Sequence, residues 1–209
     1  MQFTDRTDAG RRLAARLGDE DFVDPIVLAL PRGGVVVGAP VAEALGVPLD
    51  VFVAMKIGAP DDPEFGVGAV AEGSDQVVVS TYRRGVPEGE VRRLAPAVSA
   101  KVRDRATTFR SGRPIPDVAG RDVIVVDDGL ATGVTALAAL RALRQRGPRR
   151  LVLAVPVGSR AAIAELTPEA DSVICLSTPT AFYAVGHHYD RFDQTTDDEV
   201  MALQSSSRP

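Results

Sequence analysis

The chain has 209 residues and a formal net charge of −4, with 28 acidic against 24 basic side chains. This length suits one medium domain that spans residues 1–209, and the acidic balance argues against a nucleic-acid surface. The single cysteine excludes an intramolecular disulfide framework and favours a reducing compartment. No apolar stretch reaches the roughly 18–20 residues of a membrane span, and no signal-like leader opens the chain. We therefore expect a cytoplasmic protein that binds small molecules, with no nucleic-acid or membrane partner.

Apolar runs alternate with helical patterns along the chain, which favours the α/β class. The runs that predict strands lie at residues 26–30, 49–55, 67–71, 76–80, 122–126, 151–155 and 172–176. The patterns that predict helices lie at residues 7–17, 35–45, 87–109, 134–146 and 159–166. Pro40 removes a hydrogen bond within the second helix, which therefore starts late or bends. We expect an open, mainly parallel twisted sheet flanked by helices, with a core over about 25–177 and a disordered tail at 204–209.

A Pro/Gly turn, Pro31-Arg32-Gly33-Gly34, follows the first predicted strand. Two glycines permit backbone conformations that point consecutive amides at one anion, and the planar guanidinium of Arg32 suits phosphate oxygens. Pyrophosphate would fit such a turn. A plain strand-to-helix connection with a solvated arginine explains the same residues equally well.

Lys56 follows the apolar run at 49–55 and precedes Ile57-Gly58-Ala59-Pro60, which places a lone cation at a predicted strand end. Most lysines at such positions lie on the surface, with the stem covering apolar side chains. Residues 81–121 are polar, arginine-rich and punctuated by glycine and proline. Their simplest role is a solvated crossover built around a helix.

The most informative stretch is residues 123–135, in which a buried apolar run ends at Asp127 and Asp128 and a small-residue loop opens into a helix. The first amides of a helix have no intrahelical partner and the dipole there is positive, so a phosphate is expected at this loop. Adjacent carboxylates repel each other, and a ribose diol or a sugar-bound Mg²⁺ explains why both are present. The alternative is one aspartate that caps the loop beside a solvated one.

Two further segments lie where ligand contacts are expected. Val157 follows the strand at 151–155 in another strand-to-helix turn, and the carboxyl ends of parallel strands share one crevice. Phe182 and Tyr183 lie in an aromatic-rich segment near the C-terminus, where a flat ring could stack on a base or simply pack on the core. His187 and His188 are adjacent and lack metal-ligand spacing, so they predict no zinc site.

The stretch at 123–135 resembles the signature of type I phosphoribosyltransferases: four apolar residues, two acids, two variable positions, a small residue, and Thr-Gly-x-Thr. The match covers roughly residues 25–190. Lys56-Ile57-Gly58-Ala59-Pro60 also resembles a pattern in a bacterial subgroup of unassigned substrate. The resemblance implies the α/β fold of that family, with a helical flap around residues 81–121 and a hood around residues 178–200 that completes the base site.

The resemblance also implies the ligands. The donor is 5-phosphoribosyl 1-diphosphate (PRPP) with Mg²⁺ held by Asp127 and Asp128, which also contact the ribose. Arg32 and Lys56 stabilise the leaving pyrophosphate. The remaining residues implied to contact PRPP, pyrophosphate or the base are Gly33, Gly34, Gly129, Leu130, Ala131, Thr132, Gly133, Val134, Thr135, Val157, Phe182 and Tyr183.

The implied activity is transfer of the phosphoribosyl group to a nitrogen of a small base. A non-catalytic module that senses PRPP or a nucleotide is the alternative, because a fold does not fix its function. A dinucleotide-binding oxidoreductase is disfavoured, since no Gly-x-Gly-x-x-Gly turn is present. Homodimers are common in the family, but no segment of the sequence marks an interface.

Overall fold

The computed structural model describes residues 1–206 of the chain. Within those residues the larger sheet is parallel, and its strands lie in the order β2-β1-β6-β7-β8. The strands are β1 (Ile26–Ala29), β2 (Leu49–Val51), β6 (Asp122–Val126), β7 (Arg150–Val157) and β8 (Ser172–Ser177). The predicted α/β class with a mainly parallel sheet is therefore confirmed.

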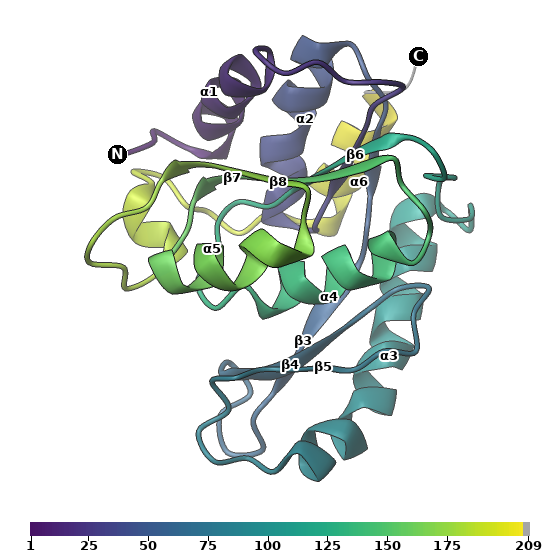
Figure 1. Cartoon of the computed structure of the whole chain (residues 1–209), viewed down its shortest axis with the longest axis vertical. Coiled ribbons are helices and arrows are strands. Elements are labelled where there is room, and N and C mark those ends of the chain that lie inside the picture. Colours follow the sequence, from purple (N-terminus) through teal and green to yellow (C-terminus); the bar gives the residue numbers. More distant parts are fainter. Residues whose placement is uncertain (207–209) are drawn as a thin grey trace.

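Helices cover both faces of this sheet (Figure 1). One face carries α1 (Arg6–Leu17), α2 (Gly33–Leu45) and α6 (Asp197–Ser206), and the other carries α4 (Val134–Arg144) and α5 (Arg160–Leu166). Alternate residues of each strand serve the two faces: Val27 and Ala29 belong to the apolar cluster of α1 and α2, whereas Ile26 and Leu28 belong to that of α4. Short 3-10 helices, η1 (Thr167–Glu169) and η2 (Val185–His188), lie near the C-terminal end.

A smaller antiparallel sheet lies beyond α4 (Figure 1). It consists of β3 (Ala54–Gly58), β4 (Gly66–Ala71) and β5 (Val78–Val79), in that spatial order. Helix α3 (Glu88–Arg110) packs against β3 and β4, while α4 contacts the same two strands from the main domain core. Helix α4 is thus shared by the two sheets.

The expected strand at 49–55 is wrong as a single strand. The chain leaves the parallel sheet after β2, and the amide of Phe52 still donates to Ala29 O at 3.0 Å before β3 begins in the other sheet. Burial hid this break, because residues 49–54 are all buried across β2, the link and the first residue of β3. As a consequence, Lys56 lies inside β3 and not at a strand end.

One of two alternatives is excluded, and one further expectation is wrong. Helix α2 begins at Gly33 and continues through Pro40, so of the two outcomes predicted for it, a late start or a bend, the late start is excluded. The tail expected to be disordered is helical as far as Ser206, because Gln204 is buried and its side-chain amide donates to Asp50. Residues 207–209 lie outside the described part of the chain. No helix within residues 1–206 has the length and apolar character needed to cross a membrane.

A buried ion pair ties α3 to the junction between the sheets. Glu72 and Arg110 form this pair with both side chains 4% exposed, and Arg110 also donates to Val51 O at 3.1 Å. Glu72 Oε1, which accepts from Arg110 Nη1, also accepts from the amide of Val53 at 2.7 Å. Each charge is thus desolvated and depends on its partner.

We therefore expect Arg110→Met to lower the free energy of unfolding by about 3–5 kcal/mol, because it leaves the Glu72 carboxylate buried and unpaired. Urea unfolding measures the change. The matched control is Arg92→Met, which breaks an exposed pair with Glu88 on the same helix and should cost less than about 0.5 kcal/mol. Equal losses for the two variants would contradict the assignment.

Candidate functional site

Neighbouring parallel strands bring the two site-like loops together. Strands β1 and β6 are paired from Ile26 with Val123 to Ala29 with Val126, and the amide of Leu30 donates to Val126 O at 2.8 Å. The Arg32 turn (residues 31–34) and the Asp127 loop (residues 127–135) therefore leave the sheet side by side. The Pro31–Arg32 peptide bond is cis.

The glycines of the Arg32 turn allow contact between the two loops. A Cβ on Gly33 would collide with the carboxylate of Asp128, and one on Gly34 would lie 2.7 Å from Val126 O and 3.0 Å from Asp127 Cα. Any larger residue would push the start of α2 away from the aspartates. The two glycines thus set how closely the Arg32 turn approaches the acidic pair.

The Asp127 loop surrounds a pocket of about 160 Å³ at the start of α4, lined by residues 127, 129–136 and 185. Gly133 is the residue before the helix, with φ of +74°, and no side chain caps the first turn. The first amides of the helix therefore keep their donor capacity for a ligand. Residues Leu130 to Thr135 lie where the sequence predicts an anion.

The turn after β7 braces this loop from one side. Leu130 donates its amide to Val157 O at 2.9 Å, and the hydroxyl of Ser159 donates to Ala131 O at 2.7 Å. The side chain of Val157 is fully buried, and a Cβ on Gly129 would lie 3.0 Å from its Cγ1. Val157 thus supports the Asp127 loop through its backbone oxygen and through the packing of its side chain.

The acidic pair is largely withdrawn from solvent. The amide of Asp128 donates to Asp127 Oδ1 at 2.8 Å. Burial, together with the neighbouring charge of Asp128, raises the pKa of Asp127 well above its usual value. Burial also raises the pKa of Asp128, although the Arg6 guanidinium opposes that rise. An ionised pair here is stabilised by any cation or hydrogen-bond donor that approaches it.

Arg6, the first residue of α1, completes the site, and sequence reasoning missed it. Its Nε lies 2.8 Å from Asp128 Oδ2, and its Nη1 donates to Asp193 O at 2.7 Å. The guanidinium carbon also lies 3.8 Å from the ring centre of Phe192. Nothing in the local pattern distinguishes Arg6 from the other arginines of α1, because its acidic partner is 122 positions away.

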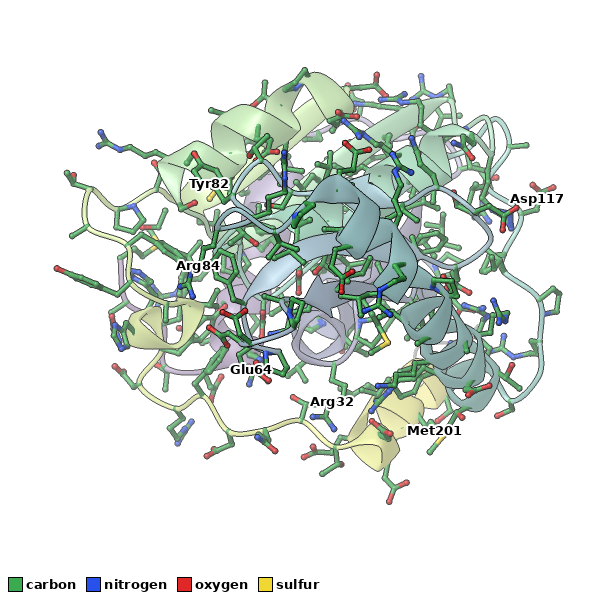
Figure 2. The ribbon with its side chains drawn as sticks, turned by 90° about the horizontal axis from the view of Figure 1, so that it is seen from below. Arg32, Glu64, Tyr82, Arg84, Asp117 and Met201 are labelled. Atoms are coloured by element: carbon green, nitrogen blue, oxygen red, sulfur yellow. The ribbon has the colours of Figure 1, made fainter. Side chains whose placement is uncertain are left out.

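Arg32 and Lys56 lie at the edges of the site and already have acidic partners. Arg32 Nη1 is 3.5 Å from Asp197 Oδ1 at the start of α6, and Figure 2 shows Arg32 beside that helix. Lys56 Nζ donates to Glu64 at 2.8 Å on the carboxylate and 2.7 Å on the backbone oxygen. Both cations are exposed, so these pairs are weak and exchangeable.

The hood segment (residues 178–200) places its two predicted aromatic residues differently. Phe182 turns inward and stacks on His188 with ring centres 5.4 Å apart, whereas Tyr183 is 82% exposed. The hydroxyl of Tyr189 donates to Asp128 O at 2.6 Å, a contact with the acidic pair that the sequence did not single out. Within residues 1–206 no cluster of three or more potential metal-binding side chains forms, and the two histidines join none.

The family of this chain follows from comparison with known proteins. A family model described as "Phosphoribosyl transferase domain" matches residues 2–190. The chain belongs to the phosphoribosyltransferase family. The resemblance seen in the Asp127 loop is thereby confirmed, and the fold is that of the type I phosphoribosyltransferases.

A relative and two solved structures give the scale of the similarity. "Putative phosphoribosyl transferase Rv0571c" of Mycobacterium tuberculosis is 44% identical over 206 residues, which are 96% of this chain and 46% of that protein. The chain thus spans about half the length of this curated relative. The crystal structure of TT1426 from Thermus thermophilus is 44% identical, with a TM-score of 0.83 and full coverage of both chains. A Neisseria gonorrhoeae protein at 16% identity, covering 100% of this chain and 96% of its own, has a TM-score of 0.54 and shares the fold alone.

The close approach of the Arg32 turn to the acidic pair can be tested with one methyl group. We expect Gly34→Ala to destabilise this phosphoribosyltransferase by about 1–3 kcal/mol, because the new Cβ meets backbone atoms of residues 126 and 127. The control, Gly89→Ala in the first turn of α3, places its methyl in open space and should be neutral or slightly stabilising. Thermal unfolding compares them, and a neutral Gly34→Ala would contradict the packing argument.

Proposed function

We propose that this protein transfers the 5-phosphoribosyl group of PRPP to a nitrogen of a small base and releases pyrophosphate. The observation that carries the proposal is the junction of three features: an uncapped helix start, a half-buried acidic pair, and a glycine turn packed against that pair. Each matches one part of PRPP, namely the 5′-phosphate, the ribose diol and the pyrophosphate. The family of the chain supports the same assignment.

The Asp127 loop holds the phosphoribosyl part in this proposal. The 5′-phosphate binds at the first turn of α4, where backbone amides and the hydroxyls of Thr132 and Thr135 are available. Asp127 and Asp128 accept hydrogen bonds from the ribose hydroxyls. Binding there positions the anomeric carbon, and such positioning is the main contribution of the protein to the rate.

The Arg32 turn and Lys56 act on the leaving group. The base nitrogen forms a bond to the anomeric carbon as the bond to pyrophosphate breaks, with inversion and oxocarbenium character in the transition state. Negative charge grows on pyrophosphate, and cations at its edge stabilise that charge. Arg32 and Lys56 reach it after exchanging Asp197 and Glu64 for the ligand.

The acidic pair fits Mg²⁺ in a limited way. Mg²⁺ usually binds through one or two carboxylates together with substrate oxygens and water, and Asp127 with Asp128 offers that number of carboxylates. Because no third acidic or histidine ligand joins them within residues 1–206, the remaining oxygens come from PRPP and water. When bound, Mg²⁺ neutralises charge on the pyrophosphate.

The hood segment and the segment at 81–121 complete the proposed site. The exposed ring of Tyr183, which lies 6.3 Å from that of His187, stacks on the acceptor, while Phe182 packs on the inner side of the hood segment. Asp62 lies in the loop between β3 and β4, and Arg84 lies in the loop after β5. These two side chains pair at 3.2 Å, and Figure 2 shows Arg84 on the same side of the molecule as Glu64. A flap in this part of the chain would exclude water from a reactive sugar cation.

We take residues 1–209 as one functional unit, which acts in nucleotide metabolism in the cytoplasm, a reducing compartment that agrees with its single cysteine. A homodimer is the assembly we expect for such a unit.

The proposed activity predicts pyrophosphate release from Mg²⁺–PRPP when pooled purines, pyrimidines and related heterocycles are present, and little release without an acceptor. Splitting the pool would then identify the base. PRPP binding without release from any acceptor would instead favour the non-catalytic regulatory module. A protein that neither binds PRPP nor releases pyrophosphate would contradict the proposal as a whole.

The ribose role predicts that Asp128→Asn weakens PRPP binding by roughly tenfold or more, because a charge-assisted hydrogen bond contributes about 1.5–3 kcal/mol. Isothermal calorimetry with Mg²⁺ present measures the affinity. Asp19→Asn is the matched control, since Asp19 is exposed at the end of α1, and its affinity should equal that of the wild type. An unchanged affinity for Asp128→Asn would show that the ribose assignment is wrong.

A further inference from the structure

Arg6 joins three parts of the chain that are distant in sequence. Its Nε contacts the carboxylate of Asp128, its Nη1 donates to the backbone of Asp193, and its planar group lies over the ring of Phe192. The side chains of Arg6 and Asp128 are 12% and 16% exposed. A charged fork that is this well enclosed has a defined geometry, unlike the exposed ion pairs of the same helix.

The contact leaves Asp128 able to bind a ligand. Arg6 occupies Oδ2, and among the hydrogen bonds of the described residues none involves Asp128 Oδ1. A carboxylate offers about four lone-pair sites, so one oxygen can stay with arginine while the other accepts from a hydroxyl. Arg6 therefore does not have to leave when a diol binds, and it restricts the directions in which Oδ1 can point.

The hood segment is attached to the same point. The N-terminal residues run along it, with Phe3 N donating to His188 O at 2.9 Å and Asp190 N to Phe3 O at 2.8 Å. Phe3 and Tyr189 are buried against each other, and the Tyr189 hydroxyl donates to Asp128 O. Arg6 lies three residues after Phe3, so the N-terminus, the hood segment and Asp128 form one continuous network.

We propose that Arg6 is a positioning residue that fixes Asp128 for the ribose and couples the hood segment to the ribose site. The part that concerns ribose rests on the proposed function. Arg6 acts through Asp128 and through Asp193 O, and it needs no contact with PRPP. Order in the hood segment and affinity for PRPP then depend on the same side chain.

Arg6 could instead block the ribose site, and that role predicts the opposite change in PRPP affinity. A pocket of about 510 Å³ borders Arg6 and is lined by Val36, Asp193 and Thr195 among others, so the side chain has room to leave Asp128. If Arg6 blocked the ribose site in this way, its removal would strengthen PRPP binding. The direction of the change in affinity therefore separates positioning from blocking.

A double-mutant cycle tests the first half of the proposal. Calorimetry with Mg²⁺ and PRPP should show binding about tenfold weaker for Arg6→Met, and an intermediate loss for Arg6→Lys, which keeps the charge but lacks the fork. In the Asp128→Asn background the same Arg6→Met change should cost less than about threefold, because its partner is gone. Equal losses in both backgrounds, or tighter binding, would overturn the proposal.

Hydrogen exchange tests the second half without any ligand. In the free protein, Arg6→Met and Asp128→Asn should each speed amide exchange over residues 188–193, and the double variant should add little. Exchange in α4 should stay as in the wild type, which shows that the fold is kept. Unchanged exchange over residues 188–193 would overturn the coupling to the hood segment.

Matched controls separate failure of this inference from failure of the proposed function. Arg16→Met removes an exposed arginine from the same helix and should change neither affinity nor exchange. If the wild-type protein binds no PRPP, the proposed function fails, and the exchange experiment alone decides whether Arg6 holds the hood segment. If PRPP binds but Arg6→Met has the affinity and exchange of Arg16→Met, the inference fails and the proposed function stands.

Discussion

The whole site depends on one steric constraint, the close approach of the first turn of α2 to the end of β6. Two paired parallel strands bring their carboxyl ends together, and Gly33 and Gly34 let the backbone of one loop lie against the aspartates of the other. The uncapped start of α4, the acidic pair and the arginine turn thereby lie next to one another at the same edge of the sheet. A single methyl group at either glycine would force these parts to separate.

Electrostatics decides what this crevice can bind. Two neighbouring carboxylates withdrawn from water raise each other's energy, and burial raises the pKa of both. The guanidinium of Arg6, near the N-terminus, offsets part of this energetic cost of burying the charges. The carboxylate charge that Arg6 does not offset favours the binding of hydroxyl donors and cations, which are the groups that a ribosyl ligand with Mg²⁺ supplies. The exposed cations Arg32 and Lys56 have only solvent-weakened partners, so a more highly charged ligand can replace those partners.

The smaller sheet and the hood segment lie beside the candidate site, through contacts with α4 and with Asp128. Helix α4 follows the Asp127 loop and contacts β3 and β4, so the second sheet is held beside the site. The buried pair of Glu72 and Arg110 attaches α3 to the same place. On the other side the N-terminal residues and residues 188–193 lie together over Asp128. Residues from near both ends of the chain thus meet beside Asp128.

The sequence by itself determined the α/β class, most of the strands, and the family resemblance of the Asp127 loop, because strand burial, helix starts and a loop motif depend on neighbouring residues. It could not determine where the chain changes sheets between Val51 and Ala54, since buried residues look alike in either sheet. Arg6 and Tyr189 were equally hidden, because each acquires its role from Asp128 through contacts across the fold. The tertiary structure alone decided these partners, since residues separated by 122 and 61 positions share no local pattern that would pair them before the chain folds.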